Sequence, residues 1–465
     1  MRETSISSGE FEEVMIIAGN GNTPATGFWL RMTSCLFSLF FLVSLFPFIP
    51  ADNLTGIKVR LTNEGLAALK DFGLTFLDEL INKDFMQTWG NAESRIKGLT
   101  FTNLAVDPAQ VVFRVQNSGL QFEIKDLHFT AELQIEGKIN TIAVEGRGVS
   151  TTIGVRLIRT QQGRLNVELP DCQVSADKLA TSSNGISGVI LDTSVAYLHQ
   201  FLISKLCTLV QRYVVPKVNT MLGNFIMVQN FKSENYNIDL NFDYTLSEDI
   251  TVTSSSIDVS FKALVYGQGR TVDMASLRTG TNPVFSRSDR MVNVGISESV
   301  FNSAGMSLYN SGPISATIPK WNSVINAVLE LASLPAGAVT LELTEAPHIT
   351  MSPRGFFLNM NAIAKSLEKP ALKPLAISCE ANMQIDIKGS KLVLLSKDID
   401  CKTNNWVARI LIKIGSGSLT LFKWFSDGLP LPLPKGVEIT QGKINYYDGF
   451  IVIEGDLNVT PVREL

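Results

Sequence analysis

Histidine, cysteine and paired acidic side chains are the residue types that could carry catalysis or hold a metal in this chain. The three histidines, His128, His199 and His348, are far apart in the sequence. Periodicity places His128 on the polar side of a strand and His199 beside the apolar stripe of a helix, whereas His348 follows a proline at the start of a strand. Acid–base catalysis needs such a group beside a second reactive group, and the sequence predicts no such neighbour.

Motifs for nucleophiles, nucleotides and metals are also missing. The chain contains no Gly-x-Ser-x-Gly segment. The glycines at 267–269 and 415–418 lack the remaining glycines of a nucleotide loop. No pair of cysteines has zinc-like spacing. The acidic pair Asp78-Glu79 fits the solvent side of a helix. The sequence therefore predicts that the chain is not an enzyme and binds no metal and no cofactor.

The cysteines point instead to disulfides. Cys35 lies in an N-terminal apolar run, and the four others can pair in three ways. A hairpin with a three-residue loop that pairs Lys388 with Leu392 puts Cys379 opposite Cys401, within the range of a disulfide after modest strand adjustment. Cys172 and Cys207 would then form the second bridge.

The N-terminal run is typical of a signal peptide. Residues 36–49 are apolar, follow Arg31 and end at Pro50-Ala51. We predict that 1–51 is a signal region that is removed, with Met32 as an alternative start, and that the protein is secreted and extracellular. A retained membrane anchor stays open as the alternative reading. Asn53 and Asn458 begin glycosylation sequons, and Pro461 weakens the second.

Composition and charge narrow the class of protein. Hydrophobic residues make up 45% of the 465 residues and charged residues 18%, against the ~25% charged of an average globular protein. This length suits two domains, each with a full core. A formal net charge of −4 gives no reason to expect nucleic acid as a partner.

Hydrophobic periodicity predicts the same order of elements twice. In the first half an amphipathic helix at 66–80, with Thr62 or Asn63 as its N-cap, precedes alternating strands from 120 to 169 and a helix at 195–213 that Pro216 should kink or end. In the second half a short helix near Val300 precedes strands from 339 to 394 and a helix at 406–425. Two last strands, 437–446 and 450–458, close the chain.

The apolar faces allow two interpretations. A curved sheet with one apolar face usually fills itself with side chains, which is the plainer meaning of each stripe. Taken together, a curved meander beside a long apolar helix in each half suits acyl chains, because burying a methylene gains ~0.8 kcal/mol.

Two segments carry a resemblance to a known family. Asp289-Arg290-Met291-Val292-Asn293-Val294-Gly295-Ile296-Ser297 with Phe301-Asn302-Ser303-Ala304-Gly305, and Gly428-Leu429-Pro430-Leu431-Pro432, resemble parts of the bactericidal permeability-increasing protein family. That family includes lipopolysaccharide-binding, phospholipid-transfer and cholesteryl-ester-transfer proteins. The order of elements is similar from about residue 54 to 460, and Cys172 and Cys207 match the family's N-terminal disulfide.

The resemblance implies an α+β fold. It is an elongated boomerang of two barrel-like modules, each a curved antiparallel sheet with long helices, joined by a central antiparallel sheet. The implied parts are an N-terminal lipid-binding barrel at 52–224, central-sheet strands at 225–265 and 436–465, a linker at 266–290 and a C-terminal lipid-binding barrel at 291–435.

Two features depart from the family's bactericidal member. Residues 53–235 hold 18 Lys and Arg against 17 Asp and Glu, a net charge of +1, so a cationic field that attracts anionic lipid is missing. The pair Cys379 and Cys401 is additional.

Three functions follow from these patterns and from the family resemblance. The first is a secreted protein that holds phospholipid or a similar acyl-chain lipid as its ligand in two apolar pockets, for carriage or transfer. The second is innate-immune recognition of bacterial lipopolysaccharide or membrane surfaces. The third is a structural or interaction protein with permanently bound lipid.

Helical periodicity gives the side chains expected to contact lipid. The expected N-terminal pocket is bounded by Leu66, Leu69, Phe76, Val195, Leu198, Leu202 and Leu206. The expected C-terminal pocket is bounded by Val300, Phe301, Ile410, Leu411, Ile414 and Leu421.

The end of the apolar run predicts the mature N-terminus. Secreted protein should begin near Asp52 or Asn53, because small and polar residues return there. N-terminal sequencing of protein from culture medium checks this. A product that still carries residues 36–49 would indicate an anchor instead.

Overall fold

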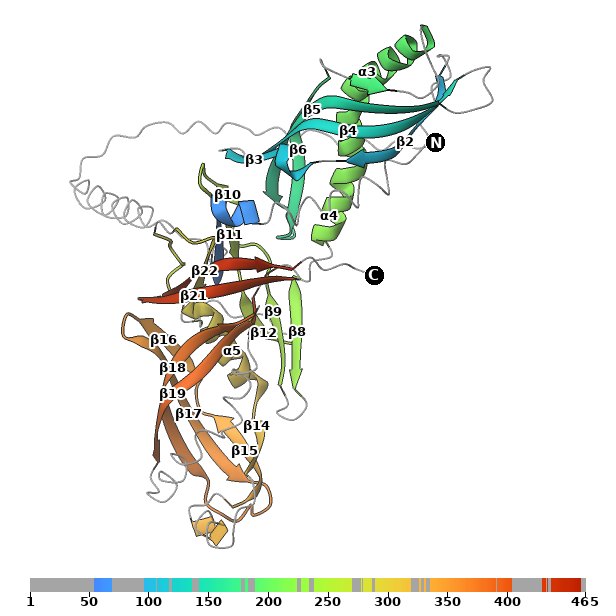
Figure 1. Cartoon of the computed structure of the whole chain (residues 1–465). Helices are drawn as coiled ribbons and strands as arrows, with labels where there is room; N and C mark the ends of the chain where they lie inside the picture. Colours follow the sequence, from blue (N-terminus) through green and yellow to red (C-terminus); the bar gives the residue numbers. More distant parts are fainter. Residues whose placement is uncertain are drawn as a thin grey trace, which may run out of the picture. The chain divides into compact units, whose positions relative to one another are not determined.

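The structure is a computed structural model of the chain (Figure 1). It describes residues 54–68, 96–105, 107–116, 119–135, 142–176, 180–182, 189–223, 227–233, 238–269, 277, 279–286, 289–318, 326–327, 330–331, 335–389, 391–403, 429–431, 433 and 436–460. The predicted signal region, Asn53 and the predicted helix at 406–425 lie outside these residues.

A six-stranded antiparallel sheet brings together segments from the whole length of the chain (Figure 1). Its strands, in spatial order, are β10 (Thr251–Val252), β11 (Ser256–Phe261), β1 (Ile57–Thr62), β13 (Val292–Ser297), β22 (Phe450–Val459) and β21 (Val437–Tyr447). Val59 of β1 pairs with Val259 on one side and Val294 on the other. We call this the central sheet.

The two faces of the central sheet differ because side chains alternate along each strand. One face is apolar and buried in the largest core cluster, for example at Ile296 and Ile453. The other face is polar: Arg60 donates from Nε and Nη2 to the two carboxylate oxygens of Asp258, each at 2.7 Å. This bidentate pair raises the pKa of the Arg60 guanidinium.

The strands of the central sheet differ in part from those expected at 225–265. Only β10 and β11 of that segment join it, whereas β8 (Val228–Ser233), β9 (Ile238–Asp243) and β12 (Leu264–Gly267) form a separate three-stranded sheet. Strands β1 and β13, assigned by sequence to the two barrels, lie at its centre. Each partner strand lies more than 150 residues away along the chain, so the local sequence pattern of a strand does not identify its partner.

The first half builds a curved sheet, which we call the N-terminal sheet. Strands β2 (Ile96–Ala105), β4 (Gly119–Ile135), β5 (Ile142–Arg159) and β6 (Leu165–Ser175) run in that order, and β3 (Val111–Gln116) and β7 (Ala180–Ser182) pair with β4 and β5. A one-turn 3₁₀ helix, Pro108–Gln110, precedes β3.

Strand β4 is the first of the alternating strands that were expected from 120 to 169. The alternation changes phase between Ile124 and Leu127, and the structure accommodates this with a β-bulge in which Asp126 has φ 51°. Both halves of the strand therefore direct their apolar side chains to the same side of the sheet.

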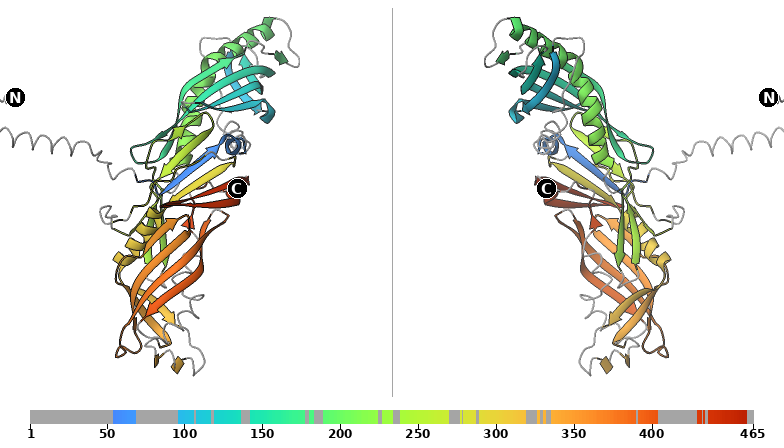
Figure 2. Two further views of the ribbon diagram at one scale, coloured as in Figure 1. Left: turned by 90° about the vertical axis from the view of Figure 1, so that its left-hand side faces the viewer. Right: turned by 90° about the vertical axis from the view of Figure 1, so that its right-hand side faces the viewer.

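One long helical segment runs along the N-terminal sheet (Figure 2). It consists of α3 (Val189–Leu209), a π-helical stretch Val210–Val214 and α4 (Val215–Gly223). Pro216 was expected to kink or end this helix. Proline has no N–H to donate to the preceding turn. The π-helical stretch before Pro216 changes the backbone hydrogen-bond pattern there, and the helix continues as α4.

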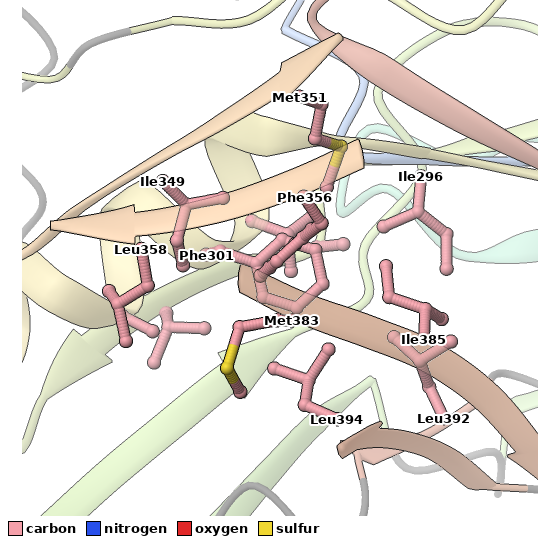
Figure 3. Close-up of a cluster of buried hydrophobic side chains, with 14 of the residues drawn as sticks. Ile296, Phe301, Ile349, Met351, Phe356, Leu358, Met383, Ile385, Leu392 and Leu394 are labelled. Carbon is pink, nitrogen blue, oxygen red and sulfur yellow. The ribbon is translucent and has the colours of Figure 1, made fainter. Parts of the chain in front are cut away.

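The second half begins with α5 (Glu298–Ser311) and builds the C-terminal sheet. Its strands run in the order β14 (Ile314–Ile318), β15 (Gly337–Leu343), β17 (Gly355–Ser366), β18 (Leu375–Lys388), β19 (Lys391–Thr403) and β20 (Leu429–Pro430), with β16 (His348–Ser352) paired to β17. Figure 3 shows its interior, where the rings of Phe301 and Phe356 meet edge to face at 5.1 Å.

Polar side chains of α5 hydrogen-bond to two neighbouring strands. The Ser303 hydroxyl accepts from the Val265 N–H, and the Ser307 hydroxyl donates to the Val265 carbonyl. On the other strand the Asn302 side chain accepts from the Ile349 N–H at 2.7 Å. Helix α5 thereby satisfies backbone groups that would otherwise be buried without partners.

Both expected disulfides form, Cys172–Cys207 and Cys379–Cys401. The second confirms that the two cysteines face each other, although the turn differs. Lys388 pairs with Lys391, not with Leu392, and a bulge after Asn382 restores the register. The one-residue errors cancel, which is why the pairing was predicted correctly from an incorrect turn.

Most described residues of the predicted linker at 266–290 are exposed, but part of the segment packs on the central sheet. Pro283 is buried, and the Thr55 N–H donates to the Asn282 side chain at 3.1 Å. Gly295 of β13 allows this approach, because a Cβ there would lie 2.3 Å from the Pro283 side chain. The Phe285 ring lies 5.0 Å from the Arg60 guanidinium.

These elements confirm the predicted α+β fold with a central antiparallel sheet. The domain limits stay predictions. The start of the helix expected at 66–80 is present, since residues 63–68 are helical and the Gly65 N–H donates to the Thr62 hydroxyl. The closing hairpin, β21 and β22, is confirmed. Within the described residues, no helix combines the length and apolar character that a membrane span requires.

The disulfide Cys172–Cys207 should stabilise the packing of α3 on the N-terminal sheet. Replacing both cysteines by serine should lower the free energy of unfolding by about 2–5 kcal/mol, as for native disulfides generally. Chemical denaturation followed by circular dichroism measures this change.

The matched variant replaces Cys379 and Cys401 by serine and should cost less, because paired strands hold those cysteines side by side without the bond. Equal costs for the two variants, or free thiols at both pairs in peptide maps, would contradict this account.

Candidate functional site

The helix-facing side of the N-terminal sheet is the candidate site. Strand register groups its side chains into three rows that cross the strands. The first row is Val111, Ile124, Thr151 and Val174; the second is Phe113, Phe122, Ile153 and Cys172; the third is Val115, Leu120 and Val155. Ten of these eleven side chains are apolar or disulfide-bonded, so the surface suits hydrocarbon.

The first row is more buried than the other two, although its member Val174 is half-buried. Val111, Ile124 and Thr151 are 4%, 7% and 5% exposed. Every member of the second and third rows is half-buried. We call these two rows the open rows. Phe113 and Phe122 contact each other there, with ring centroids 4.8 Å apart.

Helix α3 covers the buried side of this surface (Figure 2). Leu198, Leu202 and Leu206 are 0%, 1% and 6% exposed and pack into one cluster with side chains of β2, β4 and β5. The disulfide from Cys207 to Cys172 ends in the second row, so the helix is tied to the sheet where the open rows begin.

The structure places three of the expected N-terminal pocket residues together. Leu198, Leu202 and Leu206 share one side of α3, but they are tightly packed rather than bordering open space. Leu66 is 8% exposed and belongs to neither core cluster. The remaining three cannot be placed: Leu69, Phe76 and the Val195 side chain lie outside the described residues. Their lipid contact stays a prediction.

Sequence periodicity did not identify the open rows as pocket residues. Alternation at 120–124 and 153–157 identified the strands, but periodicity cannot tell a covered inward side chain from an uncovered one. The pattern Val111-Val112-Phe113-Arg114-Val115 was a signal that could have added β3 to the same surface.

The expected C-terminal pocket is described only in part. Val300 and Phe301 are 4% and 1% exposed in the core cluster, whereas Ile410, Leu411, Ile414 and Leu421 lie outside the described residues. A small apolar pocket lies between the central sheet, α5 and β19. It is lined by Ile57, Phe242, Tyr244, Ala263, Ile296, Val300, Leu392 and Leu431. Burial raises the pKa of the Tyr244 hydroxyl, which stays protonated at neutral pH.

The three histidines occupy three separate elements. His128 is exposed on β4, with Nε2 3.2 Å from a carboxylate oxygen of Asp126. His199 lies on α3, and His348 begins β16. Across the described part of the chain, no three His, Cys, Asp or Glu side chains gather as metal ligands would.

The second sequon is accessible. Asn458 is exposed near the end of β22, opposite Glu438. Its glycosylation stays a prediction.

Several basic side chains of the N-terminal module, which comprises β2–β7, α3 and α4, lie beside acidic side chains. Arg114 lies 3.6 Å from Glu123, and Arg156 lies 3.9 Å from Glu168. These pairs agree with the net charge of +1 over residues 53–235. The positive electrostatic potential that could attract an anionic surface is therefore weak.

Known proteins are similar to this chain over most of its length. The mouse phospholipid transfer protein is 22% identical over 457 residues, which cover 87% of this chain and 90% of that protein. The human BPI fold-containing family C protein is 21% identical over 468 residues, 86% of this chain and 88% of that one. A crystal structure of lipopolysaccharide binding protein aligns with a TM-score of 0.55 and 17% identity, over 88% of this chain and all of that chain.

Family models give the assignment. The N-terminal domain of the LBP / BPI / CETP family matches residues 65–225, and the C-terminal domain of the same family matches residues 235–393. The first match includes the candidate site, and β8 lies in the short interval between the two. The chain therefore belongs to the LBP / BPI / CETP family of lipid-binding and lipid-transfer proteins.

Proposed function

We propose that this protein is a secreted carrier of phospholipid or a similar acyl-chain lipid, and that one acyl chain lies on the open rows. The observation that carries the proposal is the half-buried state of seven helix-facing side chains, among them Phe113, Phe122 and Ile153. Aromatic and branched side chains gain free energy when covered by hydrocarbon, at about 25 cal/mol per Å².

The family and the named relatives support a lipid ligand in general. A phospholipid is favoured because a curated relative that shares most of the chain is a phospholipid transfer protein. The two disulfides support secretion, because such bonds persist in oxidising compartments. Catalysis is not part of the proposal, since the chemistry-bearing histidines stand apart on β4, α3 and β16.

The small pocket beside α5 is apolar, since seven of its eight lining side chains are hydrocarbon and Tyr244 alone adds a hydroxyl, but it is too small to hold an acyl chain. A second chain in the C-terminal half therefore stays an expectation from the sequence. Recognition of lipopolysaccharide is the second candidate. The charge pairs of the N-terminal module do not favour it as the main activity.

A charged substitution within the open rows tests the proposal. Ile153→Asp places a carboxylate where the acyl chain would lie, and it should lower lipid occupancy about tenfold or more, because burying an unpaired charge is costly. Half-burial of Ile153 lets the variant fold, unlike Leu202→Asp in the closed core. Native mass spectrometry with analysis of an organic extract counts and identifies the bound lipid.

Thr152→Asp is the matched control. Thr152 is the next residue along β5, pairs with Glu123 and Gln173, and faces away from the helix. The control should keep its lipid. Folded wild-type protein that carries no lipid after incubation with vesicles would contradict the proposed function.

The paired charges give a separate expectation for salt. Binding to anionic vesicles should change by less than about threefold between low and physiological salt, because a weak field leaves little to screen. Vesicle co-sedimentation across a salt series measures this. A steep dependence would reveal a local basic patch and would favour the lipopolysaccharide candidate.

A further inference from the structure

Thr151 is the one polar side chain in the three helix-facing rows. It lies on β5 in register with Ile124 on one side and Val174 on the other. Two residues earlier, Val149 is fully buried in the N-terminal core cluster. Two residues later, Ile153 belongs to the open rows. Thr151 therefore marks the boundary between the packed core and the half-buried surface.

The Thr151 hydroxyl is buried without a hydrogen-bond partner. Its side chain is 5% exposed, and Oγ1 neither donates to nor accepts from any atom in the described part of the chain. A buried hydroxyl without a partner lowers stability, whereas valine has nearly the same shape and no such cost. Both cross-strand neighbours are branched hydrocarbons, so packing alone gives no reason for threonine here.

The open rows supply a direction from which a partner can reach this hydroxyl. Thr151, Ile153 and Val155 follow one another on the same side of β5, at about 6.6 Å per step of two residues. A hydrocarbon chain that lies on the open rows reaches Thr151 at its inner end. A plain methyl terminus would leave the hydroxyl unpaired, whereas an oxygen on the chain would pair with it.

We propose that Thr151 selects lipids whose buried hydrocarbon part carries an oxygen, as a hydroxyl or a carbonyl group. The inference rests on the proposed lipid-carrier function and names the ligand class more narrowly. A threonine hydroxyl both donates and accepts, so it can pair with either oxygen group. The bound lipid would thus satisfy the one polar group that the folded protein leaves without a partner in this row.

The test is a competition between lipids that differ by one oxygen. Wild-type protein is incubated with mixed vesicles of phosphatidylcholines that carry plain stearoyl or hydroxystearoyl chains, with the hydroxyl at a series of positions. Bound lipids are then counted by mass spectrometry. We expect an enrichment of about threefold to tenfold for at least one hydroxylated isomer, the range of a single hydrogen bond. A ketostearoyl series separates the carbonyl source from the hydroxyl source.

Two matched variants complete the experiment. Thr151→Val should abolish the enrichment while still binding plain lipid, because only the hydroxyl is lost. Thr152→Val removes the same atoms on the opposite side of β5 and should keep the enrichment. Thermal denaturation verifies that both variants fold, and the lipid-free Thr151→Val protein should be at least as stable as wild type.

The outcomes separate this inference from the function on which it rests. Wild-type protein that binds no lipid contradicts the carrier function itself. Lipid binding without preference for an oxygenated chain, or the same preference in Thr151→Val as in wild type, overturns the role of Thr151 and leaves the carrier function intact.

Discussion

The helix-facing side of the N-terminal sheet carries more apolar side chain than the folded chain buries there. Alternation along β3, β4 and β5 sends one side chain in two toward the helix, and of the three rows only the first contributes side chains to the core cluster around α3. The bond from Cys172 to Cys207 holds the helix to β6 at this boundary. Covering the remaining rows would release free energy, so the sheet is prepared for a hydrocarbon ligand.

The C-terminal half buries its inward apolar side chains more completely. Inward side chains of β17, β18 and β19, such as Phe356, Met383 and Leu392, are 0–2% exposed (Figure 3). Its core continues without a break into the apolar face of the central sheet, and α5 completes the backbone hydrogen bonding at their junction. In the described residues the two halves thus share an order of elements but differ in how far their interiors are filled.

Local sequence patterns predicted the elements well and their long-range partners poorly. Alternation located β5, β6, β15 and the closing hairpin, and cysteine position located both disulfides. The central position of β1 and β13 was missed, because Val59 and Val294 pair across 235 residues and nothing in either strand alone encodes the partner. The apolar stripe on α3 was correct for Leu198, Leu202 and Leu206. The position of the helix on the sheet decides which inward side chains stay half-buried. Sequence periodicity does not contain that position.

The central claim is that a lipid chain lies on the open rows, and photo-crosslinking tests it most directly. Wild-type protein is loaded with a phosphatidylcholine that carries a diazirine within one acyl chain, irradiated and digested, and its adducts are mapped by mass spectrometry. If a lipid chain lies there, adducts should form in β3, β4 and β5 at Phe113, Phe122, Ile153 or their row neighbours. Adducts confined to outward-facing side chains of the N-terminal sheet, or found only in the C-terminal half, would contradict it.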